Sequence, residues 1–555
     1  MEKTILEELL CKEGLLTPEQ LKEAAEERQV TGQKLEQIVI AKGWLREEEL
    51  NRILADLIGA KTVDLDHYLI EPEAVQALPE EFAHTYKLMP VYKTDKTLGV
   101  AMATPTNVFL IDELQRKTGL LIEPILASEA QLGRAITQYY GTASTIKDVI
   151  ASIDERTLLQ GDEQLGEEAP IIRLVNLIII QAIQERASDV HLEPEDKFLG
   201  IRYRIDGILY RCSPIPKSLQ NAVISRVKIM AGLDIAEKRL PQDGRILMRV
   251  GQKEYDLRVS TNPVMHGENV VLRLLDKSSL VLTLEALGLD PSSLQRAKAL
   301  LARRHGIILV TGPTGSGKTT TLYALLRLLN KETVNILTVE DPVEYEFPLI
   351  RQTQVNPKAG LTFATALRAF LRQDPNIIMV GEIRDVETAT LAVHAALTGH
   401  LVFSTLHTND AATAFTRLID MGVEPFLITS SLVGVIAQRL LRKICDQCKE
   451  PYAPPAPLWE ERGVLAGTPR DITVYRGRGC VLCSRTGYKG RVGIFEVLHT
   501  SPQIQEAVLR RGTTEELKRL AVAEGMTTLR QSAIDKLRAG VTTVEEVLRV
   551  TQEIW

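Results

Sequence analysis

The sequence is 555 residues long, which is far more than one hydrophobic core usually serves, so we expect several domains. Charged residues make up 25% of it and hydrophobic residues 45%, values that are ordinary for globular proteins and that argue against disorder and membrane residence. The net charge of -6 and the aromatic content of 5% argue against nucleic acid as a partner, because a nucleic-acid channel needs dense basic and aromatic side chains.

The N-terminal residues are charged and lack the apolar core and cleavage site of a secretory signal. The most apolar stretch, residues 174–183, is roughly half of the ~20 residues needed to cross a bilayer. We therefore expect a cytoplasmic protein that contacts membranes only through partners.

The first part of the chain is expected to be modular. Residues 1–60 are predicted to form an N-terminal helical module, because related pieces recur at 14–28 and 43–57. Residues 61–150 mix strand and helix patterns, which indicates a small α/β module. The acidic, glycine-containing stretch 151–169 cannot bury enough apolar surface to fold, so it is expected to be a flexible linker.

The sequence pattern of residues 170–555 predicts four further parts of the chain. Pro170 suits the first position of an apolar helix, and strand-like runs separated by turns such as Asp206-Gly207 follow it. Apolar strands and helices then alternate, which is typical of a parallel sheet covered on both faces. The predicted parts are an α+β domain at 170–290, an α/β core at 291–441, a four-cysteine subdomain at 442–495 and a C-terminal helical region at 496–555.

A phosphate-binding loop is the clearest local motif. The apolar run 306–310 leads into G-x-x-x-x-G-K-T and then a helix, a context that a chance glycine-rich turn with a surface lysine does not explain. The glycines let backbone N–H groups converge on phosphate, Lys318 supplies positive charge, and the Thr319 hydroxyl suits Mg²⁺. The segment 330–333 lacks the final Asp of a guanine-reading box, which favours ATP. The predicted ATP-binding residues are Gly312, Pro313, Thr314, Gly315, Ser316, Gly317, Lys318, Thr319 and Thr320.

Acidic residues follow two further buried strands of the core. Glu344 comes shortly after the strand at 336–339, and Glu382 after the strand at 377–380. Ligands of open α/β sheets bind at the carboxyl ends of strands, where hydrolysis needs one carboxylate to orient water and another to hold Mg²⁺ or its waters. The alternative is a set of solvent-facing helix caps. Position 381 is Gly where P-loop enzymes generally carry a magnesium-binding Asp, so Glu382 is expected to act through water.

His407 follows a fourth strand, at 400–405, and is predicted to contact the γ-phosphate; the alternative is a histidine packed at a strand end.

Two C-x-x-C pairs lie further on, separated by about thirty residues, a spacing that suits tetrahedral Zn²⁺ in a structural site. A redox pair or two unrelated pairs is the alternative. The predicted zinc ligands are Cys445, Cys448, Cys480 and Cys483.

Four segments together resemble the Walker A, Asp, Walker B and His boxes of the secretion traffic ATPases, which drive type II secretion and type IV pilus assembly. They are residues 312–319, 339–345, 380–385 and 398–408, in the same order and spacing. The resemblance implies an α/β fold with a RecA-like P-loop core, a preceding α+β domain, a zinc subdomain and an N-terminal module. It also implies a homo-hexameric ring that hydrolyses ATP.

The resemblance also implies roles for single residues. Glu344 matches the carboxylate that activates water, Glu382 the Walker B carboxylate and His407 the γ-phosphate contact. Arg258 and Arg273 match arginines that the preceding domain places against the phosphates, which compensates charge during transfer. The alternative for each arginine is an ordinary salt bridge on a strand.

The branch of the family and its partners are also expectations from the resemblance. Residues 352–357 and 420–427 resemble the type II secretion branch more than the pilus branch, which implies two partners at the inner membrane: the cytoplasmic domain of an anchor protein and a polytopic platform protein. In some relatives a similar N-terminal module binds cyclic di-GMP through Arg-Leu-Gly. Here Ile5-Leu6-Glu7 and Lys34-Leu35-Glu36 stand in those positions, which argues against cyclic di-GMP.

Two rival functions remain open on the sequence. A nucleic-acid translocase has a similar core, although no dense basic stretch supports it. A zinc-stabilised scaffold that binds ATP without hydrolysing it is the other rival, and the intact Glu344 and Glu382 weigh against it.

Overall fold

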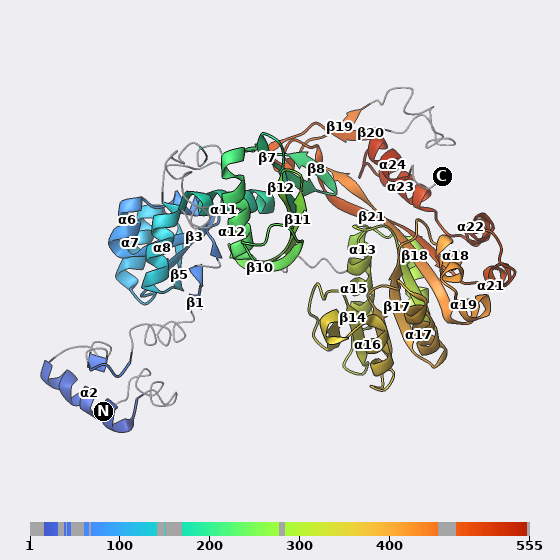
Figure 1. Ribbon diagram of the computed structural model, residues 1–555, viewed down its shortest axis with the longest axis horizontal. Helices are drawn as coiled ribbons and strands as arrows, with labels where there is room; N and C mark the ends of the chain where they lie inside the picture. The colour runs from blue at the N-terminus through green and yellow to red at the C-terminus, as the bar shows by residue number, and fades with distance from the viewer. Residues whose placement is uncertain are drawn as a thin grey trace. The chain divides into compact units, whose positions relative to one another are not determined.

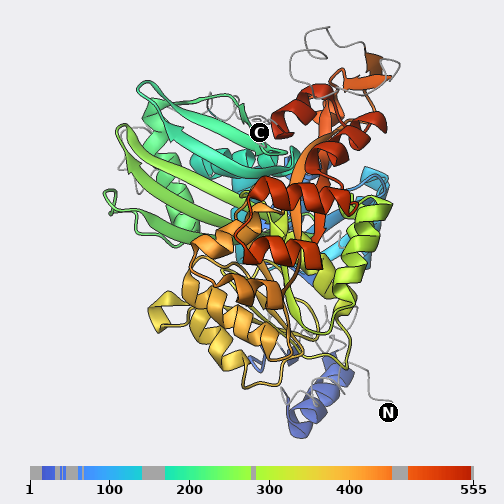
Figure 2. The same cartoon turned by 90° about the vertical axis from the view of Figure 1, so that its right-hand side faces the viewer.

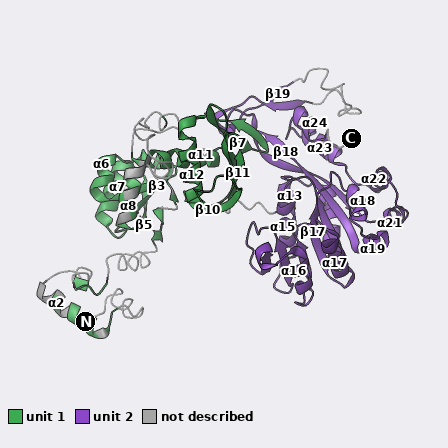
Figure 3. Cartoon of the chain, in the orientation of Figure 1, with its two compact units in different colours: residues 1–278 green, residues 279–555 purple. Residues whose placement is uncertain are grey.

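The computed structural model describes residues 16–31, 38–39, 42–45, 60–65, 68–140, 150, 169–276, 283–452 and 473–551. The chain divides into two compact units, residues 1–278 and 279–555 (Figures 1 and 3). Residues 151–168 of the predicted linker and most of the predicted helical module lie outside the described residues, as do the positions that bear on cyclic di-GMP. Among the described residues, no helix combines the length and apolar character needed to cross a bilayer.

A small four-stranded sheet forms the first part of unit 1, in the order β1-β5-β4-β3. β3 runs antiparallel to β4, whereas β4 and β1 run parallel to β5. Asn107 and Ser128 cap two of its helices by accepting hydrogen bonds from backbone N–H groups. The elements are α2 Pro18–Thr31, β1 Lys61–Thr62, α5 Pro72–Val75, α6 Glu80–Tyr86, β3 Leu88–Lys93, β4 Thr97–Met102, α7 Val108–Thr118, β5 Leu121–Leu126 and α8 Glu129–Tyr139.

A larger sheet forms the rest of unit 1, in the order β2-β10-β11-β12-β6-β7-β8, with β9 paired to β7. Buried and partly buried side chains largely alternate along β6 and β7, and the buried ones share a core with α11 and α12. Only one face of the sheet is therefore covered by these helices. The elements are β2 Tyr68–Leu69, α11 Ala169–Gln184, β6 Ala187–Pro194, β7 Phe198–Ile205, β8 Ile208–Arg211, β9 Ile215–Pro216, α12 Gln220–Met230, β10 Gln242–Val250, β11 Lys253–Val264 and β12 Gly267–Asp276.

Unit 2 is built on a seven-stranded sheet in the order β15-β14-β16-β17-β13-β18-β21. The first six strands are parallel, and β21 runs antiparallel to β18. Ile307 and Leu309 belong to a core on one face and Ile308 and Val310 to a core on the other. Because both faces are buried, the strands read as continuous apolar runs, which confirms the predicted α/β core.

The strands of this sheet are β13 Gly306–Thr311, β14 Ile336–Glu340, β15 Ile350–Gln354, β16 Ile377–Val380, β17 Leu401–Leu406, β18 Leu432–Ile444 and β21 Tyr488–His499. The helices before β18 are α13 Leu284–Leu287, α14 Pro291–Leu301, α15 Lys318–Leu329, α16 Phe363–Phe370, α17 Val386–Leu397, α18 Thr413–Asp420 and α19 Pro425–Ser431. Strand order and connections bring the carboxyl ends of β13, β14, β16 and β17 to one edge of the sheet.

The long strands β18 and β21 form a ribbon that continues from the sheet to the cysteine segment and carries the C-terminal helices. Leu441 and Ile494 of the ribbon share a core with Leu529 and Val544 of the last two helices, and Figure 2 shows these red helices beside the orange strands. The elements of this region are β19 Lys449–Tyr452, β20 Val474–Gly477, α21 Pro502–Leu509, α22 Thr514–Ala523, α23 Leu529–Arg538 and α24 Val544–Thr551, with a short 3-10 helix at Val481–Cys483.

Candidate nucleotide site and four-cysteine centre

The predicted phosphate loop connects β13 to α15, and its backbone requires glycine. Gly312, Gly315 and Gly317 have φ angles of 151°, 78° and 87°, in the region that side chains disfavour. A Cβ on Gly312 would lie 2.5 Å from the Gln438 carbonyl oxygen and from Ser316 Oγ, so the backbone there is also closely packed. The positive φ angles require glycine within the loop itself, whereas the packing on Gln438 is a contact with β18.

The remaining loop residues surround that turn. Ser316 is buried and its N–H donates to the Pro313 carbonyl at 3.2 Å, whereas Thr314, Thr319 and Thr320 are exposed. Lys318 Nζ donates to the Gly312 carbonyl at 2.9 Å and to the Pro313 carbonyl at 3.2 Å. Burial lowers the pKa of Lys318, and the charge of Glu382 opposes that shift.

Glu382 and His407 lie together after the neighbouring strands β16 and β17. Glu382 Oε2 is 3.5 Å from His407 Nε2, and Glu382 Oε1 is 2.5 Å from Arg384 Nη2. Burial lowers the pKa of His407; Lys318 and Arg384 lower it further, and Glu382 opposes the shift. The structure thus brings Lys318, Glu382 and His407 into one electrostatic cluster at the sheet edge.

Hydroxyl groups hold the two strand ends together. Ser404 Oγ donates to the Val380 carbonyl at 2.7 Å, and Thr405 Oγ1 donates to the Gly381 carbonyl at 2.8 Å. A Cβ on Gly381 would lie 3.3 Å from the Val339 carbonyl oxygen, which is tight packing for any side chain. Glu382 is therefore the first residue after β16 that offers a carboxylate to the edge.

A buried hydrogen-bond network beneath Glu344 was not predicted from the sequence. Glu340, 3% exposed, accepts hydrogen bonds from the hydroxyl of Tyr323, from Thr338 Oγ1 at 2.6 Å and from Gln352 Nε2 at 3.0 Å. The Tyr323 hydroxyl also accepts from the Glu344 N–H at 3.3 Å. Nothing in the local sequence separates Glu340 from Glu344, because only tertiary packing decides that one is buried and the other partly exposed.

β18 contributes a second set of residues that the sequence did not identify. The buried Gln438 accepts a hydrogen bond from Thr321 Oγ1 at 2.6 Å, and its backbone packs on Gly312. The first turn of α15 and the phosphate loop are thus supported by a strand more than a hundred residues away.

Arg258 and Arg273 lie in unit 1, where they are direct cross-strand partners on β11 and β12. Arg273 Nε is 3.0 Å from Asp189 Oδ1, and Arg204 Nε is 3.5 Å from Asp189 Oδ2. The ion pair expected as the alternative therefore exists for Arg273. The phosphate loop lies in unit 2, so the contact of both arginines with ATP stays a prediction.

The four predicted zinc ligands meet at one point. Their Sγ atoms all lie within 4.8 Å of one another, with separations of 3.8 Å for Cys445–Cys480, 3.9 Å for Cys448–Cys483 and 3.7 Å for Cys480–Cys483. Four thiolates around Zn²⁺ at ~2.3 Å are spaced by about 3.8 Å in a tetrahedron, so the geometry fits zinc. Backbone N–H groups of Cys480 and Gly487 also donate to Cys483 Sγ, which suits a thiolate.

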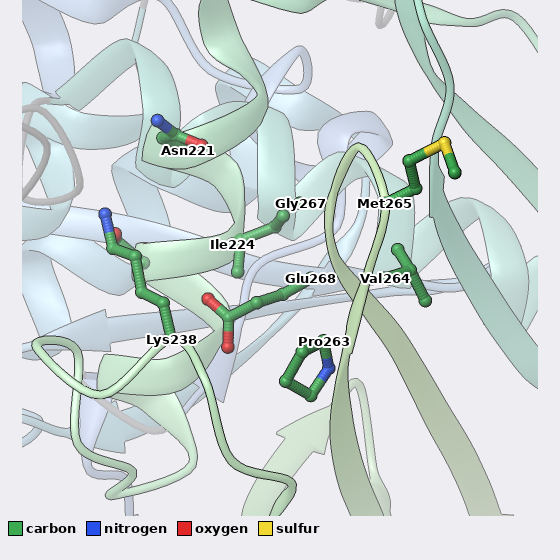
Figure 4. Close-up of a pocket in the computed structure, with 9 residues that line it drawn as sticks. Asn221, Ile224, Lys238, Pro263, Val264, Met265, Gly267 and Glu268 are labelled. Atoms are coloured by element: carbon green, nitrogen blue, oxygen red, sulfur yellow. The ribbon is translucent and has the colours of Figure 1, made fainter.

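A cavity of about 270 Å³ lies in unit 1 between α12 and the β11–β12 hairpin (Figure 4). Its lining includes Glu268, which forms a buried ion pair with Lys228 at 2.5 Å. No residue predicted to bind ATP lines it.

Comparison with known proteins agrees with this geometry. A family model described as "Type II/IV secretion system protein" matches residues 164–549, and one described as "MshEN domain" matches residues 58–146. The sequence is 44% identical to the type IV pilus assembly ATPase PilB of Myxococcus xanthus, over 98% of each chain. It is 45% identical to the type II secretion system ATPase E of Vibrio cholerae, over 87% of this chain and 98% of that one.

The solved structure of the ATPase DotB of Legionella pneumophila is similar in fold, with a TM-score of 0.51 and 22% identity over 68% of this chain and 95% of that one. The family match, the two relatives and the site geometry agree. The chain belongs to the type II/IV secretion ATPase family, which includes the ATPases of type II secretion and of type IV pilus assembly.

Proposed function

We propose that this protein hydrolyses Mg-ATP at the loop Gly312–Thr320 and uses the energy to drive a membrane-anchored secretion machine. The observation that carries the proposal is the cluster of Lys318, Glu382 and His407 at the carboxyl edge of the sheet. A cationic loop next to a carboxylate and a histidine can hold a triphosphate and stabilise its transferring group.

Each residue of the candidate site has a separate task in this proposal. Lys318 holds the β and γ phosphates, Glu344 orients the attacking water, and His407 contacts the γ-phosphate. The Thr319 hydroxyl and, through water, the Glu382 carboxylate supply hard oxygen ligands of the kind Mg²⁺ prefers. Bound Mg²⁺ neutralises charge that develops on the phosphate oxygens.

Arg258 and Arg273 complete the site when the α+β domain closes on the nucleotide. The ion pair with Asp189 is compatible with this role. Asp189 contacts Arg273 through Nε, and the terminal guanidinium nitrogens of Arg273 do not take part in that hydrogen bond. Closure and opening of the domain, repeated around a homo-hexameric ring, convert hydrolysis into movement.

The secretion branch is our first choice for the biological process. In this role the ring binds the cytoplasmic domain of an inner-membrane anchor and a polytopic platform protein, and it reaches the membrane only through them. The four-cysteine subdomain, held by Zn²⁺, shapes the surface that faces the platform. The N-terminal module docks on the anchor, and its residues 5–7 and 34–36 argue against cyclic di-GMP as a ligand.

Type IV pilus assembly is the second candidate. It is favoured by one observation: the pilus ATPase of Myxococcus xanthus aligns over 98% of this chain, whereas the secretion ATPase of Vibrio cholerae aligns over 87%. Deletion of the gene in its host separates the two, because loss of exoprotein secretion with intact pili supports secretion and the reverse supports pilus assembly.

The ATPase proposal is tested with purified full-length protein, Mg²⁺ and ATP, with and without the cytoplasmic part of the platform protein. We expect Lys318→Ala to lower turnover more than about a hundredfold, as loss of a phosphate-binding charge does, while the exposed Lys331→Ala changes it little. Normal turnover in Lys318→Ala would rule the proposal out. Strong stimulation by single-stranded DNA would instead favour a nucleic-acid translocase.

A further inference from the structure

The residues that follow β17, His407 to Ala411, form a short segment between the candidate γ-phosphate contact and the helix α18. Asp410 accepts hydrogen bonds on Oδ1 from the Thr413 N–H at 2.8 Å and from Thr413 Oγ1 at 2.5 Å, and Thr408 Oγ1 donates to the Asp410 carbonyl at 3.0 Å. We call residues 407–411 the histidine segment. Its own bonds fix its turn, but they do not fix its position on the sheet.

Two charged residues of the β18–β21 ribbon fix that position. Arg439 of β18 is 6% exposed, and its Nη2 donates to Asn409 Oδ1 at 2.9 Å. Glu496 of β21 is 1% exposed, and its Oε2 accepts from the Ala411 N–H at 3.0 Å. Glu496 is paired in register with Ala437, two residues before Arg439, so both charged side chains lie on the same face of the ribbon.

Glu496 also connects the histidine segment to the C-terminal helices. Its Oε1 accepts from the Leu529 N–H, the first residue of α23, at 3.0 Å. A second, weaker link runs from Lys518 Nζ of α22 to Asp410 Oδ2 at 3.8 Å. Three parts of the chain that are distant in sequence, at residues 411, 496 and 529, therefore meet on one buried carboxylate.

Burying a carboxylate such as that of Glu496 costs free energy. Burial raises the pKa of Glu496, and its two backbone hydrogen bonds oppose the shift. A buried charge is weak evidence for stability, because an apolar side chain of similar size often stabilises as well. What the carboxylate adds is geometry, since two N–H groups that point at its two oxygens hold the segment and the helix at a set distance.

We propose that Glu496, with Arg439, is a positioning residue for hydrolysis: it holds His407 toward the γ-phosphate and makes that position depend on the C-terminal helices. Neither residue touches the nucleotide in this proposal. The inference rests on the proposed ATPase function, in which His407 contacts the γ-phosphate. A partner that moves α22 or α23 would change turnover through this link without reaching the nucleotide.

The test compares two buried carboxylates of unit 2. Glu546 is also fully buried, and its Oε1 accepts from the Arg442 N–H at 3.0 Å, but it holds α24 and does not contact the histidine segment. In the full-length protein, Glu496→Gln replaces one acceptor with a donor that faces an N–H. We expect a similar loss of melting temperature in Glu496→Gln and Glu546→Gln.

Of these two variants, only Glu496→Gln is expected to lower kcat. With kcat expressed per bound nucleotide, we expect a loss of about tenfold, and a change in KM of less than about twofold. A fluorescent ATP analogue counts the competent sites, so partial unfolding is not mistaken for slow catalysis. A double-mutant cycle adds a second readout: in a His407→Ala background, Glu496→Gln should cost little more, because both changes remove the same contact.

If Glu496→Gln does not fold, Asn409→Ala tests the positioning role in its place. Asn409 is exposed, and its replacement removes only the hydrogen bond with Arg439. A wild-type protein without ATPase activity would overturn the proposed function itself. An active wild type whose Glu496→Gln variant, or Asn409→Ala in its place, keeps normal kcat would overturn only the positioning role. Additive losses in the cycle would do the same.

Discussion

Glu382 and His407, which follow different strands and are twenty-five positions apart, face each other with Oε2 and Nε2 separated by 3.5 Å. Glu382 also pairs with Arg384, and its charge opposes the shift in the pKa of Lys318. One carboxylate thus influences the lysine, the arginine and the histidine of the candidate site. Changes at Glu382 should therefore affect chemistry more than folding.

We expect Glu382→Gln to lower ATP turnover by about a hundredfold or more, because the amide neither attracts Mg²⁺ nor balances the surrounding cations. ATP affinity should stay within a few-fold, since Lys318 and the loop backbone remain. Steady-state turnover and binding of a fluorescent ATP analogue measure the two effects. Glu387→Gln is the matched control, because Glu387 is exposed on α17 and pairs with Arg368 of α16 rather than with a residue of the phosphate loop; a comparable loss in that variant would contradict the prediction.

The pH dependence of stability should reveal the environment of His407. Burial and the charge of Lys318 lower its pKa below the ordinary 6.5, so the unfolded chain binds this proton more readily than the folded one. The contribution of His407 is therefore fully present above pH 6.5 and is lost as pH falls through its lowered pKa. Between pH 7.5 and 5.5 the melting temperature of the wild type should fall more than that of His407→Gln, and an equal fall would refute the shift.

The network below Glu344 predicts an effect of a single hydroxyl. Tyr323→Phe keeps the buried ring but leaves Glu340 with one hydrogen-bond donor fewer, which costs about 1–3 kcal/mol of unfolding free energy. Turnover should also fall, because the Glu344 N–H loses its acceptor. Chemical denaturation and ATPase assays measure both. Tyr475→Phe is the control, since the ring of Tyr475 carries its contact with Lys449, and it should change neither quantity.

Removal of one cysteine ligand should release the metal. We expect Cys448→Ser to lower zinc content from about one ion per chain to near zero and to lower the melting temperature by more than about 5 °C. Elemental analysis and calorimetry measure these changes. Cys212→Ser, at a half-buried thiol outside the cluster, should keep its zinc. A wild-type protein that binds no zinc after expression in zinc-containing medium would refute the metal assignment.

Much of the candidate site was predictable because its signals are local. Gly312 to Thr319 are contiguous, and the positive φ angles of three glycines need only the backbone of the loop itself. The spacing of the two cysteine pairs is visible directly in the sequence. Each carboxylate or histidine at the end of a buried strand is expected at one edge of the sheet, because the carboxyl ends of parallel strands lie at the same edge. The alternation of apolar strands and helices determined the α/β core in the same way.

Only the tertiary structure decided which residues support that edge. Tyr323 contacts Glu340, Gln438 contacts Thr321, and Glu496 contacts Ala411 and Leu529, and the partners are 17 to 117 residues apart in the chain. A hydrogen bond between distant residues leaves no periodicity in either segment, because its partners are chosen by strand order and register. The sequence by itself determined where phosphate chemistry is expected, and packing decided which carboxylates face that chemistry and which hold it in place.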